Sequence, residues 1–298
     1  MRFLFVDRIT DIVPGVFARG LKHVTRDDYY VNQDHHGAWC FVPTLMGEAL
    51  GQLAAWNVMM SNGFVARPVA GIAAKAALLR PVYVGETLIL EAHIDALDDT
   101  VVQYHGDAFV GEEMVFRLEG AFGPLLPMTD FVDEAVVRRQ FDEINRPGPV
   151  CFNDYSSLGK VYDEDLSLIS HAPRMMFDRV IDSEPGVRMK AVKCISRAAV
   201  YFPDHFPNKP VLPMTVLLAC FLNLAETFIV SAGFTGRYVC REMRRVKMNG
   251  FIYPGDIFVG MMTLKHQTER EFFLTCRCEV LDQRVGVMEL VMVLEDEK

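Results

Sequence analysis

Three features are absent from this sequence, and each absence removes a class of protein. The chain has 30 Lys and Arg but 39 Asp and Glu, and this net charge of -9 argues against nucleic acid as a partner. No stretch approaches the ~18–20 apolar residues of a membrane span, and the N-terminal apolar run is too short and too charged for a signal peptide. None of the seven cysteines forms a Cys-x-x-Cys pair, which favours buried, reduced thiols. We therefore expect a cytoplasmic protein.

Several motifs for catalysis are also missing. The sequence has no Gly-rich phosphate loop and no Ser-His-Asp order. The adjacent pair His35 and His36 does not make a zinc site by itself, and the other histidines outside the segment described below lack metal-ligand spacing: His23, His93, His105, His171 and His266. We therefore expect neither a metal nor a diffusible cofactor.

The composition is that of a soluble globular protein. Hydrophobic residues make up 51% of the chain and charged residues 23%, and 298 residues suffice for two domains of ordinary size. The 21 Phe and 16 Met suit an adaptable apolar cavity or, more simply, a large apolar core.

The segment Tyr201–Pro213 contains four prolines in thirteen residues, with His205 near its middle. Each proline fixes φ and removes a backbone donor, so the spacing predicts a stiff, irregular loop. An apolar run of helical length follows from about Thr215 to Ser231, and Thr215 is placed to cap it. An imidazole beside a helix N-terminus suits acid–base chemistry on a polarised carbonyl, although a surface histidine in a proline-rich turn fits the same features.

The sequence of this loop, His205-Phe-Pro-Asn-Lys-Pro-Val-Leu-Pro213, closely resembles a family signature, His-Phe-Pro-x-x-Pro-Val-Met-Pro-Gly. The family is that of the 3-hydroxyacyl-(acyl carrier protein) dehydratases, hotdog-fold enzymes of fatty acid synthesis. The resemblance extends to Met176–Val180 and to the Pro254-Gly-Asp256 turn. The family carries a carboxylate fourteen residues after the histidine, where this chain has Ala219.

An internal repeat supplies the missing acid. Phe5-Val-Asp-Arg-Ile9 matches Met176-Phe-Asp-Arg-Val180 at an offset of 171, and Pro14-Gly-Val16 matches Pro185-Gly-Val187 in the same register. At this offset Glu48 corresponds to Ala219, and Glu48-Ala-Leu-Gly-Gln52 resembles the family helix that carries the catalytic acid. The sequence therefore predicts an α+β double hotdog, in which each copy is a long helix wrapped by an antiparallel sheet.

Family active sites take the histidine from one domain and the carboxylate from the other. The resemblance thus implies one composite site per chain, formed by His205 and Glu48, and a second pair, His35 or His36 with Ala219, that lacks the acid. His205 would remove the α-proton, and Glu48 would protonate or orient the departing 3-hydroxyl. A backbone carbonyl in the Lys209–Leu212 loop would fix the imidazole tautomer. The resemblance places five residues at the substrate, with Met214 and Thr44 standing where the family has its glycine: Met214, Thr44, Pro213, Val211 and Gln52.

The partner that the resemblance implies is an acyl carrier protein with a phosphopantetheine-linked acyl chain. Because such a carrier is acidic, it requires a basic patch, and the best candidate is the run Arg241, Arg244, Arg245 and Lys247. Strand alternation would place Arg241, Met243 and Arg245 on one face and Arg244 on the other, while a charged edge strand that discourages pairing explains the run equally well. Assembly into a homo-oligomer stays open.

The chain divides into copy one (1–127), which supplies the acid, a connector (128–170), and copy two (171–298), which supplies the histidine loop. In copy one we expect strands over 2–13 and 16–25 and a helix from about Leu45 to Met60, capped by Thr44. The connector has helical spacing over Asp130–Ile144.

Rival functions remain open. Polyketide-synthase dehydratase domains are also double hotdogs, but they usually carry the histidine in the first copy, and this chain inverts that order. A non-catalytic acyl-chain binder or assembly subunit fits the substituted glycine and the changed copy-one loop, and a hotdog thioesterase fits the His-Phe-Pro loop less well. Glu226 lies two helical turns beyond Ala219, roughly 10 Å away, which is too far for it to replace the acid.

Overall fold

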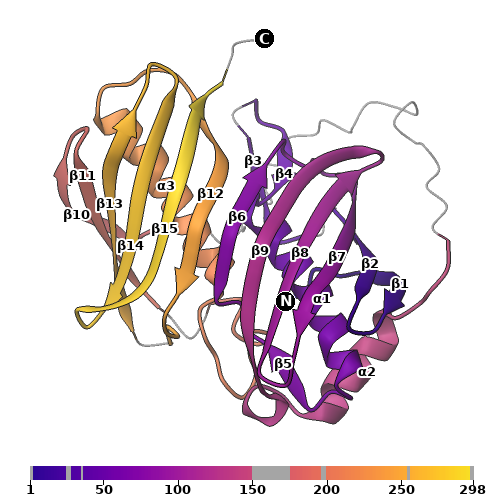
Figure 1. Cartoon of the computed structure of the whole chain (residues 1–298). Coiled ribbons are helices and arrows are strands. Elements are labelled where there is room, and N and C mark those ends of the chain that lie inside the picture. The colour runs from indigo at the N-terminus through magenta and orange to yellow at the C-terminus, as the bar shows by residue number, and fades with distance from the viewer. Residues whose placement is uncertain are drawn as a thin grey trace.

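The computed structural model describes residues 3–24, 28–34, 36–149, 175–195, 199–253 and 256–295. It contains two copies of one unit, each a long helix wrapped by antiparallel strands (Figure 1). Copy one consists of β1 (Arg8–Val13), β2 (Phe17–His23), β3 (Val31–Gln33), β4 (Trp39–Phe41), α1 (Thr44–Ser61), β5 (Ala66–Pro68), β6 (Ile72–Leu78), β7 (Thr87–Leu97), β8 (Val101–Val110) and β9 (Glu113–Pro127). The connector contributes η1 (Met128–Asp130) and α2 (Glu134–Ile144). Copy two consists of β10 (Arg179–Glu184), β11 (Arg188–Cys194), α3 (Met214–Ser231), β12 (Tyr238–Met248), β13 (Ile257–Gln267), β14 (Glu271–Val280) and β15 (Gln283–Leu294).

Apart from β3 and β4, which form a separate two-stranded sheet, the strands of both copies join in one sheet. Its order is β1-β2-β7-β8-β9-β6-β12-β15-β14-β13-β11-β10, and β5 pairs with β9 beside this path. The seam between the copies is the antiparallel pair β6 and β12, with Ala77 opposite Glu242 and Ile72 opposite Lys247. Because the two copies meet through backbone hydrogen bonds, their helices are held in a fixed relation, and α1 contacts α3 directly.

The strand registers confirm the predicted duplication. Arg8 pairs with Leu21 in copy one, and Arg179 pairs with Val192 in copy two, so both partners shift by 171. Each hairpin also carries a register shift at the same place, after Ile9 in copy one and after Val180 in copy two.

The two central helices match their predicted ranges within a residue. They are apolar around most of their circumference because the sheet covers them, as expected for buried helices. The helix α3 reaches a mean hydropathy of 1.8 over 18 residues, enough for a membrane span by length and composition, contrary to the expectation from the sequence. With 61% of that window buried inside the fold, α3 has the character of a core helix.

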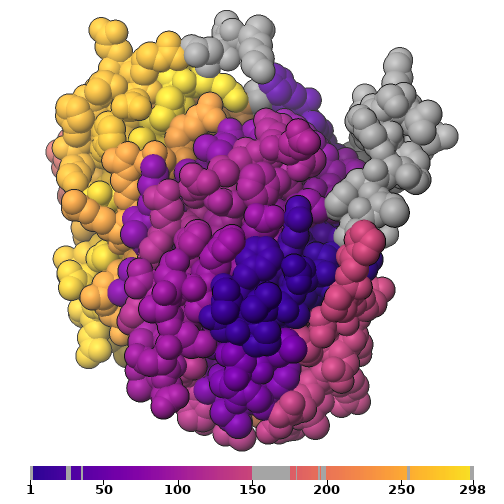
Figure 2. All heavy atoms as spheres, turned by 45° about the vertical axis from the view of Figure 1, so that its right-hand side comes forward, coloured from indigo at the N-terminus to yellow at the C-terminus, as the bar shows by residue number. Residues whose placement is uncertain are grey.

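The connector covers the outer face of α1. Phe141 of α2 packs against Trp56 and Phe64, with ring centroids 6.0 and 5.3 Å away. The chain beyond α2 then follows β1, where Arg146 N donates to Ile9 O and Gly148 N to Thr10 O. Figure 2 shows this segment lying along the N-terminal strands.

Two local predictions differ from the structure. The first strand begins at Arg8, and the residues before it form a lead-in whose Phe3 and Phe5 rings pack edge to face at 4.7 Å. Neither threonine caps its helix by a side-chain hydrogen bond. The predictions made on His35, His171, Pro254–Gly255 and the connector beyond residue 149 lie outside the described residues.

Candidate active site

The proline-rich segment folds into a loop that fixes one ring nitrogen of His205. Val211 N donates to His205 O at 3.1 Å, and His205 Nδ1 lies 3.0 Å from Val211 O. A carbonyl oxygen only accepts hydrogen bonds, so Nδ1 carries the proton and Nε2 keeps its lone pair. The predicted carbonyl in the Lys209–Leu212 loop is therefore present, and Nε2 is free to act as a base.

His205 is neutral near pH 7. Burial lowers the pKa of its imidazole, and this effect outweighs the Glu48 charge and the Val211 carbonyl, which favour the protonated form. The charge of Arg67 lowers the same pKa further.

Glu48 lies in α1 of copy one, and both of its carboxylate oxygens accept hydrogen bonds. Gln52, one turn along the same helix, donates from Nε2 to Oε1 at 3.0 Å. Thr215 of copy two donates from Oγ1 to Oε2 at 2.9 Å. Gln52 is held in turn by the N-terminal segment, since its Oε1 accepts from Phe5 N and its Nε2 also donates to Phe3 O. The carboxylate orientation is thus fixed by both copies.

One cavity of about 360 Å³ is lined by both His205 and Glu48. It continues along one face of α1 through Gln52, Ala55 and Met59. Eleven residues of helix separate Glu48 from Met59, which gives a length of about 16 Å. The two copies therefore form one elongated, mainly apolar cavity that is lined by a histidine of copy two and a glutamate of copy one.

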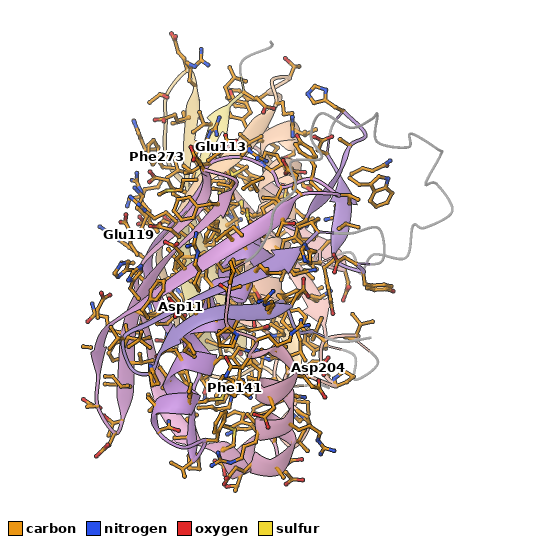
Figure 3. The ribbon with its side chains drawn as sticks, turned by 90° about the vertical axis from the view of Figure 1, so that its right-hand side faces the viewer. Asp11, Glu113, Glu119, Phe141, Asp204 and Phe273 are labelled. Carbon is orange, nitrogen blue, oxygen red and sulfur yellow. The ribbon has the colours of Figure 1, made fainter. Side chains whose placement is uncertain are left out.

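The other predicted substrate residues divide between the cavity and its frame. Met214, Thr44, Val211 and Gln52 line the cavity. Pro213 is not among its lining residues, and its carbonyl instead accepts from the first amides of α3, Val216 N and Leu217 N. Asp204, which Figure 3 labels, also lines the cavity. Its carboxylate accepts from Phe3 N at 2.5 Å.

The complementary pair has lost its acid. Pro43 already has helical dihedral angles (φ -56, ψ -38), whereas Pro213 is extended (ψ 136), so Glu48 and Ala219 stand at the same depth in their helices. Thr44 then corresponds to Thr215. Thr44 Oγ1 is buried and has no hydrogen-bond partner among the described residues, because the carboxylate that Thr215 finds in Glu48 is replaced by the methyl group of Ala219. His36 is exposed, with its backbone amide bonded to Asp34.

The basic run on β12 differs from the predicted edge strand and from the predicted strict alternation of faces. β12 is an interior strand between β6 and β15, not an edge strand. Register shifts after Cys240 and after Arg244 break the alternation, so Met243 is buried while Arg241 and Arg245 are exposed. Arg244 pairs with Glu242 at 2.5 Å and Arg245 with Glu289 at 3.3 Å. Arg241 donates to the Leu79 carbonyl, and Lys247 is exposed.

Two residues of the site carry no signal in the sequence. The predicted role of Thr215 was a helix cap, and its bond to Glu48 depends on how the copies pair. Arg67, on β5, also lines the cavity, and its Cζ lies 3.9 Å from the ring centroid of Phe206. No motif marks this arginine, because it reaches the histidine loop only across the interface between the copies.

Among known protein families, one model matches the second copy of this chain. Residues 169–290 match the model of the FabA-like domain. A 3-hydroxyacyl-[acyl-carrier-protein] dehydratase FabZ of Chloroflexus aggregans is 39% identical over 139 residues, which cover 45% of this chain and 94% of that protein. The FabZ of Oleidesulfovibrio alaskensis is 30% identical over 96 residues, or 62% of its length.

Solved structures match nearly the whole chain. A protein described as an oleoyl thioesterase of Lactobacillus plantarum has a TM-score of 0.58 at 9% identity and covers 94% of this chain. A 12:0-ACP thioesterase from Umbellularia californica has a TM-score of 0.53 at 10% identity, with 94% coverage of each chain. Identities this low show the shared double-hotdog fold alone.

Proposed function

This chain belongs to the FabZ family of 3-hydroxyacyl-[acyl-carrier-protein] dehydratases, and we propose that it dehydrates a (3R)-3-hydroxyacyl thioester to the trans-2-enoyl thioester. Its substrate would be carried on the phosphopantetheine arm of an acyl carrier protein. One composite site per chain would do the chemistry, and the acyl chain would lie in the channel along α1.

The proposed reaction uses the two ends of the acid–base pair. His205 Nε2, which keeps its lone pair because Nδ1 donates to Val211 O, would take the proton from C2. The electron pair of that C–H bond forms the C2–C3 double bond, and the C3–O bond breaks. Glu48 would orient the departing 3-hydroxyl as a hydrogen-bond acceptor, and the proton that His205 took from C2 would pass to the departing oxygen, which leaves as water. Backbone amides at the α3 N-terminus, beside Met214, are suited to polarising the thioester carbonyl.

A single observation carries this proposal: His205 from copy two and Glu48 from copy one line the same cavity. Either copy alone would provide half of the couple. The neutral state of the imidazole, which follows from its burial, is the state that a base requires.

The proposal is tested by following enoyl thioester formation from 3-hydroxyacyl-carrier protein with the wild type, His205→Ala and Glu48→Gln. We expect each variant to lose at least a hundredfold in kcat, since general acid–base groups typically contribute 10²–10⁴-fold. Equal rates in all three proteins would exclude the composite site. Release of free thiol without enoyl product would identify a thioesterase, and tight binding without turnover an acyl-chain carrier or assembly subunit.

A further inference from the structure

Arg67 brings to the cavity a cation whose Nε has no hydrogen-bond partner among the described residues. Its guanidinium makes no hydrogen bond or ion pair with any residue that the structure describes. Burial lowers the pKa of Arg67 to about 10, with the charge of Glu48 opposing the change, so the side chain stays charged at neutral pH. Desolvation of an unpaired cation opposes folding, and a bound anion would offset this cost.

The guanidinium of Arg67 and the imidazole of His205 lie on opposite sides of the Phe206 ring. The His205 imidazole stacks on the Phe206 ring at 4.1 Å with an interplanar angle of 23°, and Arg67 Cζ lies 3.9 Å from the same ring centroid. Two groups this close to one centroid must occupy opposite faces of the ring. Phe206 therefore separates the guanidinium from the imidazole, and Arg67 Cζ lies at most 8.0 Å from the centroid of the His205 ring.

The carboxylates of the cavity do not serve as partners of Arg67. Those lining it are Glu48 and Asp204: Asp204 accepts from Phe3 N, and the charge of Glu48 raises the pKa of Arg67 without outweighing the effect of burial. Both oxygens of Glu48 already accept hydrogen bonds, from Gln52 and Thr215. Phe131 and Phe206 provide aromatic faces for the cation but no acceptor, which leaves its N–H groups available to a ligand.

We propose that the site takes acyl thioesters whose chain carries a carboxylate a few carbon atoms from C3, and that Arg67 binds this carboxylate. The proposal rests on the proposed function insofar as the ligand is an acyl thioester. A guanidinium presents parallel N–H donors that match the two oxygens of a carboxylate, and a low-dielectric wall strengthens such a pair. A plain hydrocarbon chain would leave the cation desolvated and unpaired.

The test is a binding titration with two unreactive ligands, hexanedioyl-pantetheine and hexanoyl-pantetheine, followed by calorimetry. We expect the wild type to bind the carboxylated ligand at least tenfold more tightly. Arg67→Met, which keeps the length of the side chain but not its charge, should lose at least tenfold of this selectivity, and Arg67→Lys should retain part of it. Equal affinities of the wild type for the two ligands, or unchanged selectivity in Arg67→Met, would overturn the proposal.

This experiment is independent of the proposed chemistry because neither ligand carries a 3-hydroxyl group. Selective binding without dehydration of any 3-hydroxyacyl thioester would refute the dehydratase function and leave the carboxylate site standing. If Arg67 instead stabilises the developing enolate, Arg67→Met would lower kcat equally for charged and uncharged 3-hydroxyacyl thioesters and would leave the binding selectivity unchanged. That outcome also overturns the proposal. If Arg67→Met does not fold, the selectivity of Arg67→Lys for the carboxylated ligand still tests the role of Arg67.

Discussion

The hydroxyl of Thr215 in copy two donates to the carboxylate of Glu48 in copy one, with 2.9 Å between Oγ1 and Oε2. This bond crosses the interface between the two helices and sets the direction in which the acid faces the cavity. At the equivalent position, the buried hydroxyl of Thr44 has no partner among the described residues. The two threonines are therefore a matched pair: the hydroxyl of Thr215 makes a hydrogen bond, and the hydroxyl of Thr44 makes none with the described residues.

Thr215→Val should destabilise the fold by about 1–2 kcal/mol, because a hydrogen bond to a charged group is lost and Glu48 loses one of its donors. Thr44→Val should leave stability unchanged or raise it, because it removes a buried hydroxyl whose desolvation is not compensated by a hydrogen bond. Urea unfolding of both variants beside the wild type measures the difference. Equal destabilisation by the two substitutions would contradict the assigned hydrogen bond.

Thr215→Val should also lower kcat by about tenfold and leave KM less affected, since the loss acts on the orientation of Glu48. The double variant Thr215→Val with Glu48→Gln checks this route. If Thr215 acts through Glu48, adding Thr215→Val to Glu48→Gln should change the remaining activity little.

The buried histidine predicts a pH dependence of stability. Burial lowers the pKa of His205 in the folded protein below its value near 6.5 in the unfolded chain. The unfolded chain then binds more protons in this interval, so stability contributed by the neutral imidazole is present above about pH 6.5 and is lost as pH falls toward the folded pKa. His205→Gln should reduce the fall in unfolding free energy between pH 7 and pH 5. An identical fall in both proteins would mean that another group is responsible.

Activity should follow the same ionisation. Because the proposed base is the neutral form of His205, the acid limb of kcat/KM should lie below pH 6.5. A pH–rate profile of the wild type measures it, and an acid limb above pH 6.5 would contradict the neutral imidazole.

The sequence predicts the parts of this site that lie within one loop or one helix. The prolines around His205 fix a loop whose Val211 carbonyl accepts a hydrogen bond from the imidazole, and the offset of 171 places Glu48 at the position that Ala219 holds in copy two. These features follow from local geometry and from the repeat.

Contacts between copies could not be predicted in the same way. The bond from Thr215 to Glu48 and the approach of Arg67 to Phe206 depend on the seam of β6 and β12, whose register no local pattern determines. The predicted faces of β12 were wrong for a related reason. Two register shifts in β12, which strict alternation does not anticipate, leave Arg241 and Arg245 exposed to solvent while Met243 is buried.

The channel along α1 predicts a limit on chain length. Ala55 lines the cavity between Glu48 and Met59, so Ala55→Phe should fill it and lower kcat/KM for long acyl chains by at least tenfold while short chains are still turned over. Met59→Ala should have the opposite effect, because it enlarges the far end. Rates with a series of 3-hydroxyacyl thioesters measure both shifts, and parallel losses at every chain length would place the acyl chain elsewhere.

The surface of β12 predicts where a carrier protein docks. Arg244 and Arg245 are paired with Glu242 and Glu289, which offsets their charge, whereas Arg241 and Lys247 are exposed and belong to no ion pair among the described residues. Charge reversal at both, Arg241→Glu with Lys247→Glu, should raise KM for the carrier-bound substrate by at least tenfold at low salt and leave kcat nearly unchanged, since exposed charges act mainly on encounter.

Two controls separate docking from damage to the site. The same variant should show an unchanged KM for the pantetheine thioester, which carries the reacting group without the acidic carrier. Arg139→Glu, an exposed reversal on α2, should leave KM for the carrier-bound substrate within about twofold of the wild type, because it lies on the connector away from β12. A rise in KM for both forms of substrate would indicate a disturbed cavity, and an equal rise with Arg139→Glu would show that net charge, not the β12 surface, governs the encounter.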